Sequence, residues 1–168
     1  MKKIMALVFF LSVSLYAQES LYALKGGVLS HSTGPVSSGR EEGVDLNIEL
    51  LFNTYVLKAH PSIGTDINLN GDTSFVYAGL SWEGKFFQYL LLGAFFGVAA
   101  HNGSLDDSDA DKRQFGTRIV FREAVDIGFY LHDDISLSLM YDHYSNAGLS
   151  GKQNQGNDNI GLRISYYF

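Results

Sequence analysis

Hydrophobic and polar residues alternate with a period of two along several stretches of the chain. The clearest is Val44–Leu50, where every even-numbered residue is apolar and Asp45, Asn47 and Glu49 are polar. The same alternation returns in residues 63–70, 135–142 and 159–168. Because successive side chains of a β-strand point to opposite faces, the pattern predicts strands with one apolar and one polar face.

Stretches of this kind divide the chain into eight predicted strands, which lie at about 20–30, 43–56, 62–70, 73–83, 87–101, 113–131, 134–147 and 157–168. The connections at 31–42, 102–112 and 148–156 are long and rich in Gly, Ser, Asp and Asn, whereas those at 57–61, 84–86 and 132–133 are short. Asn70-Gly71-Asp72 predicts a tight turn between the third and fourth strands. Long loops alternating with short turns are typical of outer-membrane barrels.

The first residues have the pattern of a targeting signal rather than of a strand. Met1-Lys2-Lys3 is basic, and Ile4–Val13 is an apolar run too short to span a bilayer. Ser14–Ala17 offers a small-residue cleavage site before Gln18. We therefore expect a signal peptide at 1–17, a barrel domain at 18–168 and localisation in the bacterial outer membrane.

The predicted strands fit a soluble sandwich, whose apolar faces meet in a core, or a membrane barrel, whose apolar faces contact lipid. Three features favour an eight-stranded antiparallel transmembrane barrel. The chain carries an export signal. Its predicted interior positions hold charges of both signs, Asp45, Glu49 and Arg163, which could pair in a narrow lumen. Its last strand ends at Phe168, which resembles the C-terminal signal read by the barrel-assembly machinery of outer-membrane proteins.

One residue does not fit the predicted lipid-facing stripe. On the sixth strand Glu123 shares its parity with Ile119, Phe121, Val125 and Ile127. A β-bulge would turn Glu123 into the lumen, because one extra residue reverses the facing of those that follow it. The sequence leaves open whether such a bulge is present.

Composition narrows the classes of partner and cofactor. The net charge is −6 and the basic residues form no block, which argues against a nucleic-acid partner. The chain has no cysteine, so disulfides and thiolate metal sites are excluded. Its five histidines show no metal-ligand spacing. We therefore expect neither a metal nor another cofactor.

A candidate catalytic set lies at the loop end of the last two strands. His143 and Ser145 are two residues apart on one strand, so they share a side, and their parity is that of Leu137 and Leu139 on the lipid-facing stripe. Asp158 has the same outward parity on the neighbouring strand. Ser, His and a carboxylate form the nucleophile, base and orienting acid of acyl transfer.

The residues after Ser145 add candidate oxyanion donors. Asn146 and the backbone around Ala147-Gly148 would supply N–H groups close to the nucleophile. If both termini are periplasmic, the whole set lies at the outer leaflet of the membrane. The alternative interpretation is a rim whose polarity rises as the strands leave the bilayer.

The segment His143-Tyr144-Ser145-Asn146-Ala147-Gly148-Leu149 resembles the signature of PagL-type lipid A 3-O-deacylases, an acyloxyacyl hydrolase family. Gly79–Trp82, Gly97–Ala100, Phe121 and Asn154–Asp158 also stand where similar residues stand in that family. The clear similarity covers roughly the second half of the chain, whereas the first strands match only in pattern.

The resemblance implies an outer-membrane barrel that removes the 3-position acyl chain of lipid A in lipopolysaccharide without a cofactor. It makes His143 the base, Ser145 the nucleophile and Asp158 the acid. It also places Asn146 and Gly148 in the oxyanion region and Phe121 near the site. The family's acid is Glu, one methylene longer than Asp158, and the last loop here is one residue longer, which would compensate for the shorter reach.

Two other function classes fit the same barrel. One is a non-catalytic small barrel with an adhesive or structural role, which needs no contact between the three side chains. The other is an outer-membrane phospholipase or acyltransferase, whose lipid products would differ. The sequence leaves a monomer and a homodimer both open.

Overall fold

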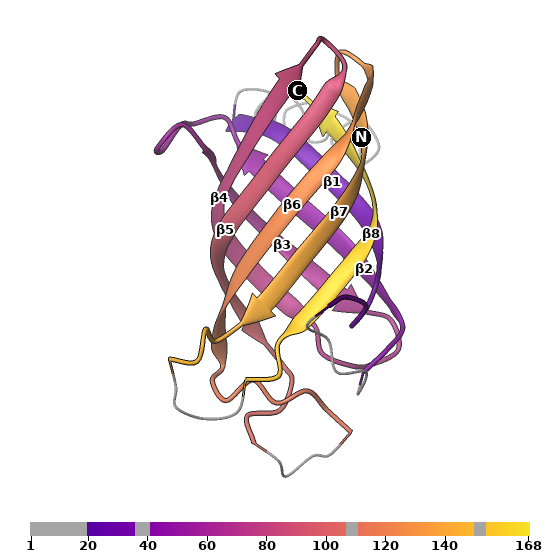
Figure 1. The fold of residues 1–168 in the computed structure, drawn as a ribbon. Helices are drawn as coiled ribbons and strands as arrows, with labels where there is room; N and C mark the ends of the chain where they lie inside the picture. Colours follow the sequence, from indigo (N-terminus) through magenta and orange to yellow (C-terminus); the bar gives the residue numbers. More distant parts are fainter. Residues whose placement is uncertain (1–19, 36–40, 107–110, 150–153) are drawn as a thin grey trace, which may run out of the picture.

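The computed structural model describes residues 20–35, 41–106, 111–149 and 154–168, so the expected signal peptide lies outside the described residues. A closed antiparallel barrel runs in the order β1-β2-β3-β4-β5-β6-β7-β8 (Figure 1), which confirms the predicted fold class. The strands are β1 Leu21–Ser30, β2 Val44–Phe52, β3 His60–Asn68, β4 Phe75–Phe86, β5 Leu90–His101, β6 Ile119–His132, β7 Ile135–Ser145 and β8 Asn157–Tyr167. No helix in this part of the chain is long and apolar enough to cross a membrane.

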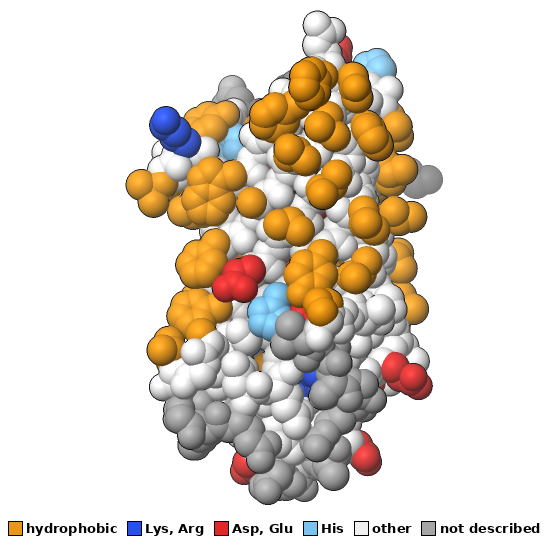
Figure 2. All heavy atoms as spheres, in the orientation of Figure 1, with side chains coloured by type: hydrophobic (Ala, Val, Ile, Leu, Met, Phe, Trp, Pro, Cys, Tyr) orange, Lys and Arg blue, Asp and Glu red, His pale blue; other side chains and the backbone are white. Residues whose placement is uncertain are grey.

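The period-two pattern sets which side chains face the lumen. On β2, Asp45 and Asn47 are fully buried inside the barrel, whereas Leu46 and Ile48 are 38% and 41% exposed on the outer wall. Figure 2 shows hydrophobic side chains over the wall, giving way to other side chains at the loop end. The exposed apolar surface is therefore the lipid-facing band of the barrel.

The two ends of the barrel differ as the sequence predicts. In Figure 1 the start of β1, the C-terminus and the short turns lie at one end, and the longer loops lie at the other. The third-to-fourth strand connection is the expected tight one, with Gly71 at a φ of 92°.

Several strand boundaries differ from the prediction. β2 ends at Phe52 instead of residue 56, and β4 continues to Phe86, which moves the next turn to Phe87 and Gln88. Both turn residues have positive φ, 50° and 68°, as a two-residue hairpin turn requires, although neither is the usual Gly or Asn. β6 begins at Ile119 rather than residue 113, because Arg113 bonds to other loops instead of to a strand.

The lumen is filled by paired charges rather than by a hydrophobic core alone. Arg163 donates to Glu49 at 2.6 Å and also pairs with Asp126, while Arg122 pairs with Asp142 at 2.9 Å. The expectation that interior charges of opposite sign pair in the lumen is confirmed for Arg163 and Glu49. The other acid singled out from the sequence, Asp45, bonds to His31 at 2.8 Å.

Glu123 stays on the outer wall, so a bulge at this position is the wrong interpretation. The β6–β7 register runs without interruption through Phe121↔Ser145, Arg122↔Tyr144 and Glu123↔His143. A bulge here would pull Arg122 out of the lumen, where its guanidinium lies 3.8 Å from the centre of the Tyr77 ring. The carboxylate of Glu123 is therefore exposed on the lipid-facing side.

We predict that Arg163→Met lowers the free energy of unfolding by about 3–5 kcal/mol, because it leaves Glu49 and Asp126 as buried carboxylates without their cation. Urea unfolding in lipid vesicles measures the change. The neighbouring lipid-facing variant Ile164→Met is the matched control and should shift stability by less than about 0.5 kcal/mol. Equal unfolding midpoints for the two variants would contradict a stabilising role for the ion pairs.

Candidate active site

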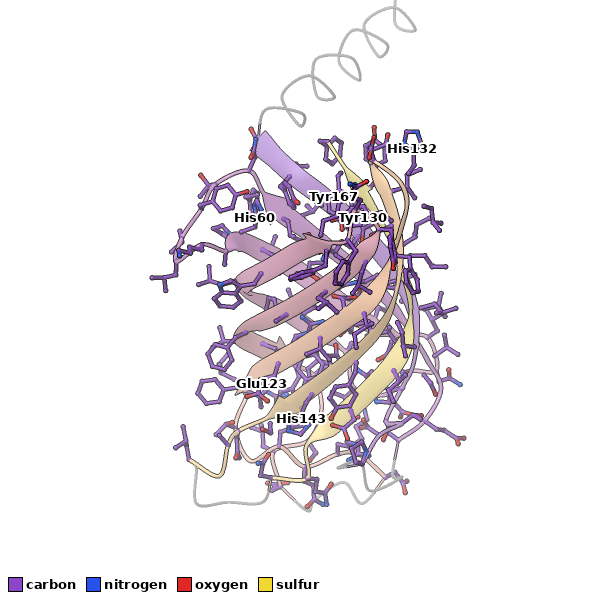
Figure 3. All side chains as sticks on the ribbon, turned by 45° about the horizontal axis from the view of Figure 1, so that its top comes forward. His60, Glu123, Tyr130, His132, His143 and Tyr167 are labelled. Carbon is purple, nitrogen blue, oxygen red and sulfur yellow. The ribbon has the colours of Figure 1, made fainter. Side chains whose placement is uncertain are left out.

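His143 and Asp158 meet across β7 and β8 on the outer wall. The two residues are direct partners in the strand register. The His143 Nδ1–H donates to Asp158 Oδ1 at 2.6 Å, and the Tyr141 hydroxyl donates to the same oxygen at 3.0 Å. The His143 ring is 18% exposed, and Figure 3 shows it near the loop end of the barrel. The candidate base and its candidate orienting acid are therefore in contact through Nδ1 of His143, and its second ring nitrogen, Nε2, is not bound to Asp158.

Ser145 lies on the same face of β7 as His143, two residues closer to the loops. It is half-buried at the end of β7, opposite Phe121 of β6. Within the described residues the Ser145 hydroxyl forms no hydrogen bond. A nucleophile and its base are often separated in an empty active site and close only around substrate. Ser145 therefore lies on the same face as His143 and Asp158, but its hydroxyl is not hydrogen-bonded to either of them.

Phe121 forms an apolar wall beside Ser145, the candidate nucleophile. Its ring stacks near that of Phe96 on β5, with centroids 6.0 Å apart and planes 16° apart. Next to Phe121, on the side away from the loops, a groove of about 430 Å³ lies on the outer wall over β5, β6 and β7. It is lined by Ala94, Phe95, Glu123, Ala124, Val125, Tyr141 and His143. An extended apolar chain could lie there with one end at His143.

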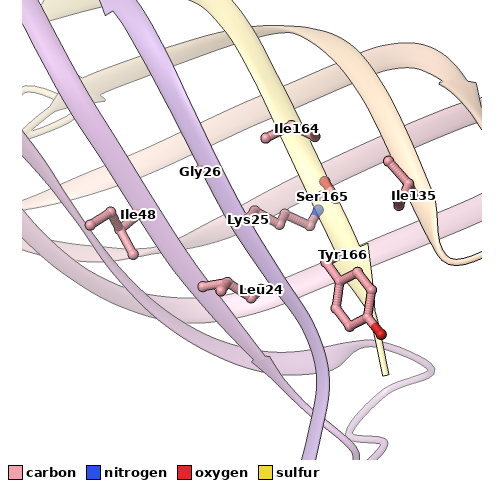
Figure 4. Close-up of a pocket in the computed structure, with 8 residues that line it drawn as sticks. All are labelled: Leu24, Lys25, Gly26, Ile48, Ile135, Ile164, Ser165 and Tyr166. Atoms are coloured by element: carbon pink, nitrogen blue, oxygen red, sulfur yellow. The ribbon is translucent and has the colours of Figure 1, made fainter. Parts of the chain in front are cut away.

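A second hollow in the outer wall, of about 460 Å³, lies near the other end of β7, over β1 and β8 (Figure 4). Apolar side chains surround it, among them Leu24, Ile48, Ile135 and Ile164. None of the candidate catalytic residues lines this hollow. Of the two hollows, only the groove is lined by a candidate catalytic residue, His143.

The turn after Ser145 presents backbone N–H groups next to the nucleophile. Ala147 and Gly148 have φ values of 52° and 72°, and Leu149 N–H closes the turn on Asn146 O at 3.1 Å. Asn146 holds the turn, because its Oδ1 accepts from Gly148 N–H at 2.7 Å and its Nδ2 donates to Phe115 O at 2.7 Å. The N–H of Ala147 forms no hydrogen bond to another described residue.

Asn154 also holds the turn after Ser145, a role that the sequence motif did not predict for it. Its Oδ1 accepts the Asn146 N–H at 3.1 Å and so ties the two sides of the last loop together. Its only sequence signal is its place four residues before Asp158. In the described part of the chain, no group of three or more His, Asp or Glu side chains is arranged to hold a metal ion.

The segment after β1 covers the acid. Asp158 is fully buried, and Thr33 N–H donates to its backbone oxygen at 2.8 Å. Gly34 packs so closely that a Cβ there would lie 2.4 Å from Asp158 Cβ and 2.7 Å from Oδ2. This cover was not predicted, because it joins residues from opposite ends of the chain.

His31 anchors the covering segment. Its ring bonds to Asp45 at 2.8 Å and to Glu41 at 3.2 Å. Burial lowers the pKa of His31, but the hydrogen bonds to the two carboxylates outweigh burial and raise the pKa to about 9. His31 is therefore a protonated ion-pair partner at neutral pH.

Comparison with known proteins gives one family match. A family model described as lipid A 3-O-deacylase (PagL) matches residues 11–167, which is most of the chain. A search of curated proteins finds no match.

Several solved structures share the fold, and three of them are compared with this chain below. The crystal structure of the outer membrane enzyme PagL has a TM-score of 0.64 and 18% identity, and the match covers 87% of this chain and 99% of that one. A de novo designed transmembrane β-barrel has a TM-score of 0.55 and 12% identity, with coverage of 90% and 99%. Neisserial surface protein A has a TM-score of 0.53 and 8% identity, with coverage of 88% and 97%. At these identities the likenesses establish the barrel fold.

We predict that Gly34→Ala slows covalent labelling of Ser145 by a fluorophosphonate about tenfold or more, because the added Cβ displaces Asp158 from His143. Mass spectrometry of the peptide that contains Ser145 gives the labelling rate. Gly26→Ala is the control, since a Cβ there meets only one atom, at 4.0 Å. Equal rates in the two variants would show that the cover does not position the acid.

The His31 anchor predicts a pH-dependent stability difference. The pKa of His31 rises from 6.5 in the unfolded chain to about 9 in the fold, so its stabilisation is complete below pH 6.5 and is lost as pH rises through 9. The gap in urea midpoint between the wild type and His31→Gln should therefore be larger at pH 6 than at pH 10. A gap that does not change with pH would contradict a charged His31.

Proposed function

Because this chain belongs to the PagL family of lipid A 3-O-deacylases, we propose that it hydrolyses the 3-position acyl ester of lipid A by a Ser–His–Asp mechanism. The observation that carries the mechanism is the hydrogen bond of 2.6 Å from His143 Nδ1 to Asp158. It orients an imidazole on the outer wall of a membrane barrel, beside a serine on the same face. Few structural roles require such a pair on a surface that contacts lipid.

The first half of the reaction transfers the acyl group to the enzyme. Ser145 Oγ attacks the ester carbonyl carbon while His143 Nε2 takes the hydroxyl proton. Asp158 holds the Nδ1–H tautomer and stabilises the imidazolium that forms. The tetrahedral intermediate collapses by breaking the bond to the sugar oxygen, and His143 returns its proton to that oxygen. The products are the sugar hydroxyl and an acyl-serine.

The second half releases the fatty acid. Water attacks the acyl-serine carbonyl carbon, His143 accepts the water proton, and the proton returns to Ser145 Oγ as the carboxylic acid leaves. In both halves the oxyanion requires N–H donors, and Ala147 N–H is the one in this turn without a bond to another described residue. Asn146 and Gly148 then act by holding the turn. No metal or organic cofactor takes part in this scheme.

The location of the site supports a lipid substrate. His143 lies where the lipid-facing band meets the loops (Figure 3), and Ser145 is the last residue of β7, closer to the loops. This is the level of ester groups in an outer leaflet. Phe121 and the groove below it offer apolar surface to an acyl chain. We further propose that residues 1–17 direct export and that Phe168 is read during barrel assembly.

We predict that lipid A from cells expressing the wild type loses one acyl chain by mass spectrometry, whereas Ser145→Ala leaves lipid A intact. Asp158→Asn should lower the initial deacylation rate about 10²–10⁴-fold, because His143 loses its orienting carboxylate. Ser136→Ala, on the lumen side of the same strand, is the matched control and should retain the wild-type rate. Loss of a chain with Ser145→Ala would refute the assigned nucleophile, and loss of a phospholipid chain instead would refute the substrate.

A further inference from the structure

Glu123 lies at the candidate site, and the proposed mechanism gives it no role. Its carboxylate is exposed on the outer wall, in line with Val125 and Ile127, which are 48% and 58% exposed. No other described side chain forms a hydrogen bond or ion pair with it. A carboxylate that faces lipid is costly to retain, so such a position indicates a functional role.

Its place in the register puts Glu123 directly beside the base. Glu123 of β6 is the cross-strand partner of His143, whose other flank is occupied by Asp158 of β8. Side chains of a direct cross-strand pair have Cβ atoms about 4.5–5.5 Å apart. Figure 3 shows Glu123 and His143 side by side near the loop end. Both residues line the groove that continues along the wall.

The orientation of a membrane lipid decides which part of the substrate meets Glu123. With its ester at Ser145, the headgroup stays at the membrane surface and the acyl chain runs along the wall toward the bilayer centre. Glu123 pairs with His143, two residues before Ser145 on β7. Its carboxylate therefore lies about 6.6 Å along the strand from Ser145, on the side toward the bilayer centre. The first few carbons after the ester carbonyl therefore pass this carboxylate before the chain enters the groove between Ala94, Val125 and Tyr141.

We propose that Glu123 is a specificity-determining residue that selects acyl esters carrying a hydroxyl within a few carbons of the ester, by accepting a hydrogen bond from that hydroxyl. The inference rests on the proposed function. A plain methylene chain would cover the carboxylate without giving it a donor, which disfavours binding. A site built to bond a substrate hydroxyl discriminates strongly against the analogue that lacks it.

Two synthetic esters test the proposal on the purified full-length protein in detergent micelles. Both are glucosamine 3-O-esters, one with a tetradecanoyl chain and one with a 3-hydroxytetradecanoyl chain. We expect kcat/KM for the hydroxylated ester to exceed that for the plain ester about tenfold or more in the wild type. Glu123→Leu should bring this ratio close to one. Glu123→Gln, which keeps an acceptor oxygen, should retain part of the preference.

Controls separate this role from the alternatives. Ile127→Val, on the same outer face of β6 and outside the groove, should keep the wild-type ratio. An equal fall of kcat/KM on both esters in Glu123→Leu would overturn the proposal, because it would mean that Glu123 acts on His143 rather than on the chain. A ratio of the two kcat/KM values that is unchanged in Glu123→Leu would overturn the proposal as well. If Ser145→Ala abolishes activity in that case, the proposed function still holds. A wild type inactive on both esters would overturn both.

Discussion

The closing ladder between β1 and β8 is the constraint on which the rest of the structure depends. It pairs Ala23 with Tyr167 at one end and Ser30 with Ile160 at the other. A bilayer offers no water to unpaired backbone groups, so a sheet in lipid is stable only when no edge is left open. Once the barrel closes, each strand residue faces either the lumen or the lipid, and the period-two pattern decides which.

Closure also explains how the candidate catalytic groups are held on the outside of the barrel. The lumen is narrow and filled by ion pairs such as Arg163–Glu49, which leaves no room for a lipid. The outer wall contacts lipid directly, and the fixed register of β6, β7 and β8 holds Glu123, His143 and Asp158 in one row across three strands. What strand pairing alone does not supply is cover for the acid, and the segment at Gly34 provides it.

Local sequence rules predict the parts of this protein that depend on alternation. They give eight strands, the facing of their side chains and the contact between His143 and Asp158, because each follows from period two and from adjacency along the chain. The turn at Phe87 and Gln88 was misplaced, since neither residue carries a turn signal. The cover over Asp158 depends on packing between distant segments. The outward facing of Glu123 was left undecided by the sequence, and the lumen contacts of its neighbour Arg122 account for it.

In the mechanism that we propose, Ser145 carries the acyl group during hydrolysis of lipid A. Rapid quenching of purified protein mixed with lipid A, followed by mass spectrometry of the peptide that contains Ser145, tests it most directly. We expect a transient mass increase of one acyl chain on Ser145, formed before free fatty acid accumulates. Fatty acid released without any adduct, or an adduct on another residue, would contradict it.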